Sequence, residues 1–394
     1  MNNQFYDSIT FYDLFDFFDL FDLIMPEAIY QEALEAYVNP HPPARAGTDG
    51  DDPVGRSFHE FAVVPLGAGL INQSYKITSQ YSGDSFLLQK INTHVFTEPE
   101  NVQNNYELIW KYISANSVDF YMPEPKYFPD NQTLFRDSKN NYWRIFEFIG
   151  NSYTPSTFKV KQAKDAAIIF GEFASCMDEF DAEQLHIVIP GFHDLSLRYK
   201  QFELSLRTDN SRRLIKTALL ADELKKRERY ANFYDVIIES EEFPRRVMHH
   251  DAKIANVLYD KDDDEVLCPV DFDTTMPGYF FSDLGDMIRT MTCPVDENSV
   301  DFEKITIRKK FYEAIIEGYL KSMNDHLTAS EKKYIHYAGL LMTYMQALRF
   351  LSDYLNGDVY YKVDYKEQNF DRAKNQLTLL EKLEKFIKVN YTIL

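Results

Sequence analysis

The sequence contains few cysteines and no CxxC pair. Only three of its 394 residues are cysteine, namely Cys176, Cys268 and Cys293. This scarcity excludes a disulfide framework and predicts a reducing compartment, so we expect a cytoplasmic protein. Since 45% of the residues are hydrophobic, a chain of this length can bury a large core, and we expect it to form two lobes.

Basic residues are also fewer than acidic residues. The 42 Lys and Arg residues are outnumbered by 62 Asp and Glu residues, which gives a formal net charge of -20. Such a chain repels nucleic-acid phosphates and anionic lipid headgroups, which argues against both as partners. A nucleotide substrate remains compatible, because ATP arrives with Mg²⁺ and carboxylates hold that metal.

The sequence lacks an uninterrupted apolar run long enough for a membrane span. The most apolar stretch, residues 8–25, is broken by four aspartates: Asp13, Asp16, Asp19 and Asp22. Each of these charges would be costly inside a bilayer, and no basic region or small-residue cleavage site indicates a signal peptide. We expect an amphipathic helix that docks on this protein or on a partner. Its acidic polar face disfavours a membrane surface.

Residues 26–38 also have a helical pattern, and residues 39–55 are rich in Pro, Gly and Asp. We therefore interpret residues 1–56 as a helical extension with a flexible linker.

From Phe61 onward the pattern changes to short strands. Residues 61–66, 74–78 and 86–91 predict an antiparallel meander whose first turn contains glycines. A helix over 98–114 and a strand over 143–149 follow. After Gly150 the apolar spacing is mainly helical, over residues 163–180, 195–207, 212–238 and 331–355. The pattern predicts an α+β protein with a small sheet lobe, residues 57–149, and a larger helical lobe, residues 150–394.

The strongest chemical signal is the stretch HHDAKIAN at residues 249–256. Its H-x-D-x-x-x-x-N spacing is that of a kinase catalytic loop. Phosphoryl transfer needs a carboxylate beside the attacking hydroxyl and an oxygen ligand for magnesium. Asp251 fits the first role and Asn256 the second. The ammonium of Lys253 could neutralise charge on the transferred phosphoryl group.

The second half of the signal follows an acidic turn. A strand over 257–259 and a return strand over 266–271 predict a hairpin that brings Asp271 beside Asn256. The alternation of a strand would put Asp271 and Asp273 on one face. With Asn256 they form a plausible ligand set for Mg²⁺. A solvated acidic turn is the alternative, but the joint occurrence of loop and hairpin favours catalysis.

The signals for ATP in the sheet lobe are weaker. Gly67 and Gly69 would let backbone N–H groups approach phosphates, although a plain hairpin turn explains them equally well. Lys90 is either a phosphate-binding lysine or a surface lysine, and its acidic partner could be Glu100 or Glu107. In the connector, the backbones of Glu147 and Ile149 could contact an adenine, or this segment could simply be a buried strand end.

Taken together, these motifs resemble the aminoglycoside phosphotransferase and choline kinase superfamily. The likeness rests on the glycine loop, which includes Asn72, on residues 249–256 and on the V-D-F-D stretch at 270–273. It implies a protein-kinase-like bilobal fold, ATP as co-substrate and Asp251 as catalytic base. It also implies that Asn256 and Asp271 hold magnesium and that Asp283 braces the catalytic loop.

Four further stretches resemble the N-acetylhexosamine 1-kinase branch: GLINQSY at 69–75, LQKIN at 88–92, DTTMPG at 273–278, and RFLSDYLNGD at 349–358. This likeness implies phosphorylation of the anomeric hydroxyl of an N-acetylhexosamine. Arg349, Asp353 and Tyr354 are then candidate sugar contacts, although Arg349 and Asp353 could simply form an i,i+4 helix pair. The chain departs from the branch at Lys90, where arginine is common, and in residues 1–56.

Two alternatives remain open. The first is a kinase of another small alcohol, such as choline or an aminoglycoside, on the same fold. The second is a nucleotide-binding pseudokinase that acts through partners, with residues 8–25 as the docking element.

Overall fold

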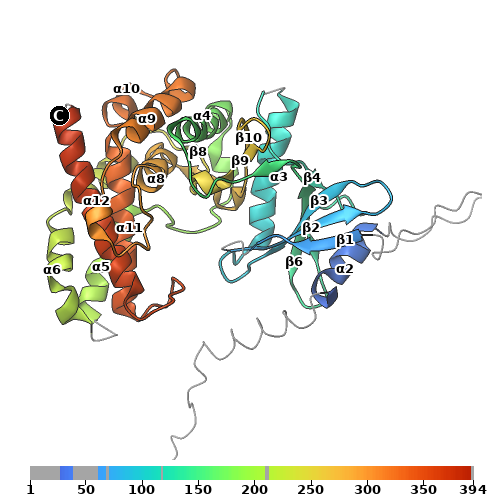
Figure 1. The fold of residues 1–394 in the computed structure, drawn as a ribbon, viewed down its shortest axis with the longest axis horizontal. Coiled ribbons are helices and arrows are strands. Elements are labelled where there is room, and N and C mark those ends of the chain that lie inside the picture. Colours follow the sequence, from blue (N-terminus) through green and yellow to red (C-terminus); the bar gives the residue numbers. More distant parts are fainter. Residues whose placement is uncertain (1–26, 39–60, 68–70, 117–118, 209–212, 392–394) are drawn as a thin grey trace, which may run out of the picture. The chain divides into compact units, whose positions relative to one another are not determined.

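The computed structural model describes residues 27–38, 61–67, 71–116, 119–208 and 213–391 (Figure 1). The chain divides into two compact units. The first comprises Met1–Pro99 and Glu124–Gly150, and the second comprises Glu100–Pro123 and Asn151–Leu394. One division between the units falls after Gly150, and residues 100–123 group with the second unit.

The described part of the first unit contains an antiparallel sheet in the order β1-β2-β3-β6-β4, with β5 also paired to β6. Its strands are β1 (Phe61–Pro65), β2 (Gln73–Ser79), β3 (Ser85–Ile91), β4 (Pro125–Lys126), β5 (Phe135–Arg136) and β6 (Tyr142–Glu147). The predicted meander of the first three strands is confirmed, with Val63 opposite Ile77 and Tyr75 opposite Leu88.

Helix α2 (Glu27–Val38) packs on one face of this sheet (Figure 1). Ala33 and Leu34 are fully buried in one cluster with Ile77 and Leu88. The predicted helix over 26–38 is thus confirmed, but it is part of the core of the first unit rather than of a separate extension. The predicted helix over 8–25 and the linker over 39–55 lie outside the described residues.

The second unit begins with α3 (Pro99–Ala115), whose side chains explain why it groups there. Asn105 Nδ2 donates to the backbone oxygens of His186 (2.8 Å) and Thr275 (3.0 Å). Tyr106 meets the ring of Phe272 edge-on at 5.8 Å. These partners lie far from α3 in sequence, so its spacing alone could not reveal them.

Helices form most of the second unit. They are α4 (Val160–Cys176), α5 (Leu195–Thr208), α6 (Leu214–Lys225), α7 (Arg229–Glu239), α8 (Phe281–Met291), α9 (Lys309–Met323), α10 (Ala329–Lys333), α11 (Tyr337–Asn356) and α12 (Gln368–Asn390). Helix α4 packs along α9, and α11 packs against α5, α8 and α12 (Figure 1). None of the described helices combines the length and apolar character needed to cross a bilayer.

Two segments that were each predicted to form one continuous helix are interrupted in the structure. The helix expected over 212–238 is broken between α6 and α7 by a turn, where Arg227 bonds to Glu384 of α12. The helix expected over 331–355 begins only at Tyr337, after the short α10. At the break between α6 and α7, a contact with a distant helix overrides a continuous apolar spacing.

Short strands flank the segments that the sequence predicts to be catalytic. Strands β7 (Ser152–Tyr153), β9 (Val257–Asp260) and β10 (Val266–Pro269) form one small sheet, while β8 (Arg246–Met248) pairs with β11 (Met276–Gly278). The predicted hairpin is confirmed as β9 and β10. The expectation that its return strand reaches Asp271 was wrong, because β10 ends at Pro269 and Asp271 has a left-handed backbone (φ 65°).

Candidate active site

A buried carboxylate fixes the start of the catalytic loop. Asp283, in the first turn of α8, accepts the backbone N–H groups of His249 (2.9 Å) and His250 (2.7 Å) on its two oxygens. Burial raises the pKa of Asp283 to about 7, while the two N–H groups oppose that rise. Because both bonds reach the loop backbone, the bracing role expected for Asp283 is confirmed.

His249 ties the loop to the segment that carries Asp271. Its Nδ1 accepts the N–H of Asp251 (3.3 Å), so its Nε2 is the protonated nitrogen that donates to the backbone oxygen of Val270 (3.1 Å). Thr274 Oγ1 donates to the backbone oxygen of His249 (2.7 Å). Burial lowers the pKa of His249 to about 4, which keeps this ring neutral.

Asp251, Lys253 and Asn256 converge within this loop. Lys253 Nζ donates to Asp251 Oδ2 at 2.7 Å, and Asn256 Nδ2 donates to the same oxygen at 2.9 Å. Asn256 Nδ2 also reaches the backbone oxygen of Asp251 (2.9 Å), which fixes the orientation of the amide. Its Oδ1 must then point away from Asp251, the direction required of an oxygen that would bind a cation.

The hairpin brings the segment with Asp271 and Asp273 to this loop. The N–H of Val270 donates to the backbone oxygen of Asn256 (2.9 Å), so Asp271 follows a residue bonded directly to Asn256. Asp271 is exposed, and Asp273 is 3% exposed within a single 3₁₀ turn. Burial alone would lower the pKa of Lys253, but Asp251, Asp286 and Asp271 outweigh it, and the pKa is raised.

The donor set suits a hard cation. An amide oxygen from Asn256 and carboxylates from Asp271 and Asp273 are the ligand types that Mg²⁺ prefers. No group of three or more His, Cys, Asp or Glu side chains in the described residues is arranged to hold a metal ion. A magnesium ion here would therefore depend on the asparagine, on water and on nucleotide oxygens as well as on the two carboxylates.

The first unit contains the residues predicted to bind ATP. Gly67 has a positive φ of 32°, and Gly69 lies outside the described residues. Asn72 Oδ1 accepts the N–H of Asn92 at 3.0 Å, which fastens the end of the glycine loop to the end of β3. Lys90 is half-buried and lies opposite Gln73 and Trp143 in the sheet.

Gln89 and Lys90 lie on opposite faces of β3 and therefore have different neighbours. Strand alternation puts Lys90 on the face of Leu88, which α2 covers, and Gln89 on the opposite face. There Gln89 Oε1 accepts two N–H groups of Arg144, at 3.0 and 3.2 Å. At the end of β6, Glu147 Oε2 accepts the N–H of Glu124 (3.4 Å), and Ile149 is half-buried.

The three predicted sugar contacts lie in different surroundings. Arg349 is half-buried and lies over the rings of Phe192, Tyr360 and Tyr361. Asp353 instead accepts the backbone N–H groups of the loop over 359–361, at 2.8 to 3.0 Å. Tyr354 is buried and donates to Glu367 at 2.5 Å. Asp353 and Tyr354 thus support the surrounding structure, whereas Arg349 presents its guanidinium to aromatic faces.

The sequence analysis missed a buried group behind the loop. His250 and His193 both bond to Ser282 Oγ, and their Nδ1 atoms lie 3.1 Å apart. Nearby, Asp286 accepts two N–H groups of Arg289, at 2.8 and 3.0 Å. The i,i+3 spacing of Asp286 and Arg289 could have revealed that pair, but nothing in the sequence connects His193 to His250.

A family model described as the phosphotransferase enzyme family (APH) matches residues 62–325 of the chain. The chain belongs to this family. It is a phosphotransferase.

Solved structures share the fold of this phosphotransferase at low sequence identity. An aminoglycoside phosphotransferase from Alicyclobacillus acidocaldarius is 11% identical with a TM-score of 0.55, covering 88% of this chain and 99% of that one. A microcompartment-associated aminopropanol kinase is 14% identical with a TM-score of 0.54, covering 92% and 98%. A Plasmodium vivax ethanolamine kinase is 14% identical with a TM-score of 0.51, covering 82% of each chain. The expected protein-kinase-like fold is confirmed.

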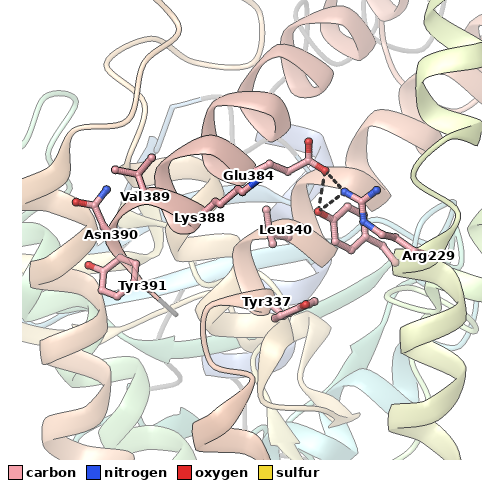
Figure 2. A pocket seen from close by; sticks show the side chains of 9 residues that line it. Arg229, Tyr337, Leu340, Glu384, Lys388, Val389, Asn390 and Tyr391 are labelled. Atoms are coloured by element: carbon pink, nitrogen blue, oxygen red, sulfur yellow. Dashed lines mark hydrogen bonds and ion pairs between the residues drawn. The ribbon is translucent and has the colours of Figure 1, made fainter. Parts of the chain in front are cut away.

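The phosphotransferase also has a pocket of about 630 Å³ that none of the catalytic-loop residues line. It is formed by residues of α7, α11, α12 and the segment after α12 (Figure 2). Figure 2 shows Glu384 pointing toward Arg229, and Glu384 also accepts the hydroxyl of Tyr230 at 2.8 Å. The opposite charges of Arg229 and Glu384 in this pocket thus pair with each other.

Proposed function

We propose that this kinase uses ATP and Mg²⁺ to phosphorylate the anomeric hydroxyl of an N-acetylhexosamine in the cytoplasm. The observation that carries the phosphoryl-transfer chemistry is the hydrogen-bonded set of Asp251, Lys253 and Asn256. The backbone bond from Val270 to Asn256 joins this set to the Asp271 segment. Cys176, Cys268 and Cys293 are not in disulfides, which is compatible with a reducing compartment.

In the proposed reaction, Asp251 receives the proton of the attacking hydroxyl. Both of its side-chain hydrogen bonds end on Oδ2, so Oδ1 is the oxygen that faces the substrate hydroxyl. Lys253 is held beside Asp251, where its ammonium stabilises negative charge on the transferred phosphoryl group. Asn256, Asp271 and Asp273 would hold Mg²⁺, which would neutralise phosphate charge when bound.

The proposed contacts with ATP are Gly67, Gly69, Asn72, Lys90, Glu147 and Ile149. Of these, Asn72 has a partner that supports a role in shaping the glycine loop, since it bonds to the backbone of Asn92. Lys90 shares its face of β3 with buried Leu88, so a role at the phosphates is the least supported of the set.

For the sugar, Arg349 and the rings beside it support the proposal. A planar guanidinium and aromatic faces are groups that bind hydroxyls and sugar rings. Asp353 and Tyr354 would not contact the sugar directly. Asp353 shapes the loop that carries Tyr360, and Tyr354 bonds to Glu367.

An acceptor screen tests the proposal. Purified protein, ATP and Mg²⁺ are incubated with N-acetylglucosamine, N-acetylgalactosamine, choline, ethanolamine and an aminoglycoside, and ADP release is measured. We expect turnover with an N-acetylhexosamine and a phosphate on C1 by ³¹P NMR. Turnover confined to amino alcohols or aminoglycosides would contradict the sugar assignment. ATP binding without any acceptor would instead favour a pseudokinase.

A further inference from the structure

A cluster of aromatic and cationic side chains lies next to the catalytic loop in the second unit. Phe192 stacks on His193 with 4.4 Å between ring centroids, and His193 lies 5.0 Å from His250. His250 immediately precedes Asp251 in the chain. This contact chain connects Phe192 directly to the residue before the proposed base.

Two arginines from different helices meet at Phe192. Arg349 of α11 places its guanidinium carbon 5.2 Å from the centre of the Phe192 ring. Arg198 of α5 donates from Nη2 to the backbone oxygen of Phe192 at 3.2 Å. The remaining bonds of the two guanidiniums go to neutral groups: Gln201 for Arg198, and Gln346 and Tyr360 for Arg349.

Neither arginine forms an ion pair within the described part of the chain, and the Nε of Arg198 is a buried N–H with no hydrogen-bond partner there. Other buried arginines of the same unit are neutralised: Arg246 by Glu331, and Arg289 by Asp286. Asp194 acts on Arg198 electrostatically but forms no ion pair with it. Leaving a partly buried guanidinium without a directly bonded counter-charge is costly. Because the chain is strongly acidic, two such arginines side by side point to a ligand that supplies the missing oxygens.

The surroundings of His193 have the same sign of charge. Burial lowers the pKa of His193 well below its usual value, and the nearby His250, Arg349 and Arg198 lower it further. The pKa of Arg198 is likewise lowered by burial and then by Arg349, while Tyr360, Tyr361 and Asp194 act in the opposite direction. The two guanidiniums would repel a positively charged group placed against them and attract an oxygen-rich one.

We infer that Arg198 and Arg349 form an acceptor subsite that binds a carbonyl or carboxylate oxygen and rejects acceptors that carry a positive charge. This inference rests on the proposed kinase function and adds Arg198 as a specificity-determining residue. Two kinds of ligand group fit this subsite, an acyl amide and a carboxylate, because both present an oxygen that accepts hydrogen bonds.

The test compares sugars that differ in one group. N-acetylglucosamine, glucosamine and glucuronic acid share one ring scaffold and carry an amide, a cationic amine and a carboxylate. Their binding is measured by isothermal titration calorimetry at pH 7, and their turnover by ADP release. We expect at least one of the amide and carboxylate sugars to bind about 10-fold or more tightly than glucosamine.

The variant Arg198→Gln should weaken binding of the preferred sugar and raise its KM about 10- to 100-fold, with ATP binding unchanged. Arg207→Gln, on the exposed end of the same helix, is the matched control and should behave as the wild type. Glucosamine binding at least as tight as both other sugars, no binding by any of them, or an unchanged Arg198→Gln variant would overturn the inference. Sugar binding without phosphate transfer would refute the proposed function and leave the subsite intact.

Discussion

The substitution Asp251→Asn is predicted to abolish most of the activity while preserving the fold. Asp251 Oδ2 accepts hydrogen bonds from Lys253 and Asn256, and no amide NH₂ group can replace it in that position. The amide oxygen of the variant must therefore take the place of Oδ2. The NH₂ group then lies where Oδ1 was, and it presents a donor to a hydroxyl that needs an acceptor.

The size of the effect follows from this loss. Removing a general base lowers turnover about 10²- to 10⁴-fold, equivalent to about 3–5 kcal/mol in the activation barrier. The Lys253–Asp251 ion pair is partly exposed, with side-chain exposures of 27% and 23%. Its loss should therefore change the free energy of unfolding by about 1 kcal/mol or less.

The assay is steady-state ADP release at saturating ATP, together with ATP affinity and thermal unfolding. Asp222→Asn is the control, because it removes an Asp–Lys pair to Lys226 on the exposed surface of α6. That variant should match the wild type in all three measurements. If Asp251→Asn kept more than about a tenth of the wild-type turnover, Asp251 could not be the base.

Three further predictions follow from neighbouring contacts. Asn256→Ala should raise the Mg²⁺ concentration for half-maximal activity about 10-fold or more, as measured by a Mg²⁺ titration at fixed ATP; an unchanged midpoint would exclude Asn256 as a ligand. Glu331→Gln removes the buried partner of Arg246 at 2.9 Å and should cost about 3 kcal/mol by urea unfolding; a cost below about 1 kcal/mol would show the pair to be dispensable. Burial lowers the pKa of His249 to about 4 and that of His250 to about 3. The folded state therefore binds fewer protons than the unfolded chain, whose histidines titrate near 6.5, and stability should fall as the pH drops from about 6.5 to 4. The slope of unfolding free energy against pH should be shallower in His249→Gln, and an equal slope would contradict a neutral buried His249.

Local patterns predicted several elements correctly. The meander, the hairpin and most long helices are set by apolar spacing and turn residues that act within a few positions. Errors occurred where distant contacts decide the backbone. Arg227 bonds to Glu384 across the fold at the break between α6 and α7. Asp271 leaves the strand with a left-handed backbone, which strand alternation does not predict.

The amino-acid order alone is enough to single out the residues of the loop. Asp251, Lys253 and Asn256 lie within six consecutive residues, so their convergence requires only a short turn and one hairpin. The tertiary structure decided which groups surround that loop. Asp283 anchors the loop backbone, and Arg198 and Arg349 meet at Phe192, although their helices are far apart in the chain. Sequence periodicity shows which face of a helix is buried, but only packing determines which other helix that face contacts.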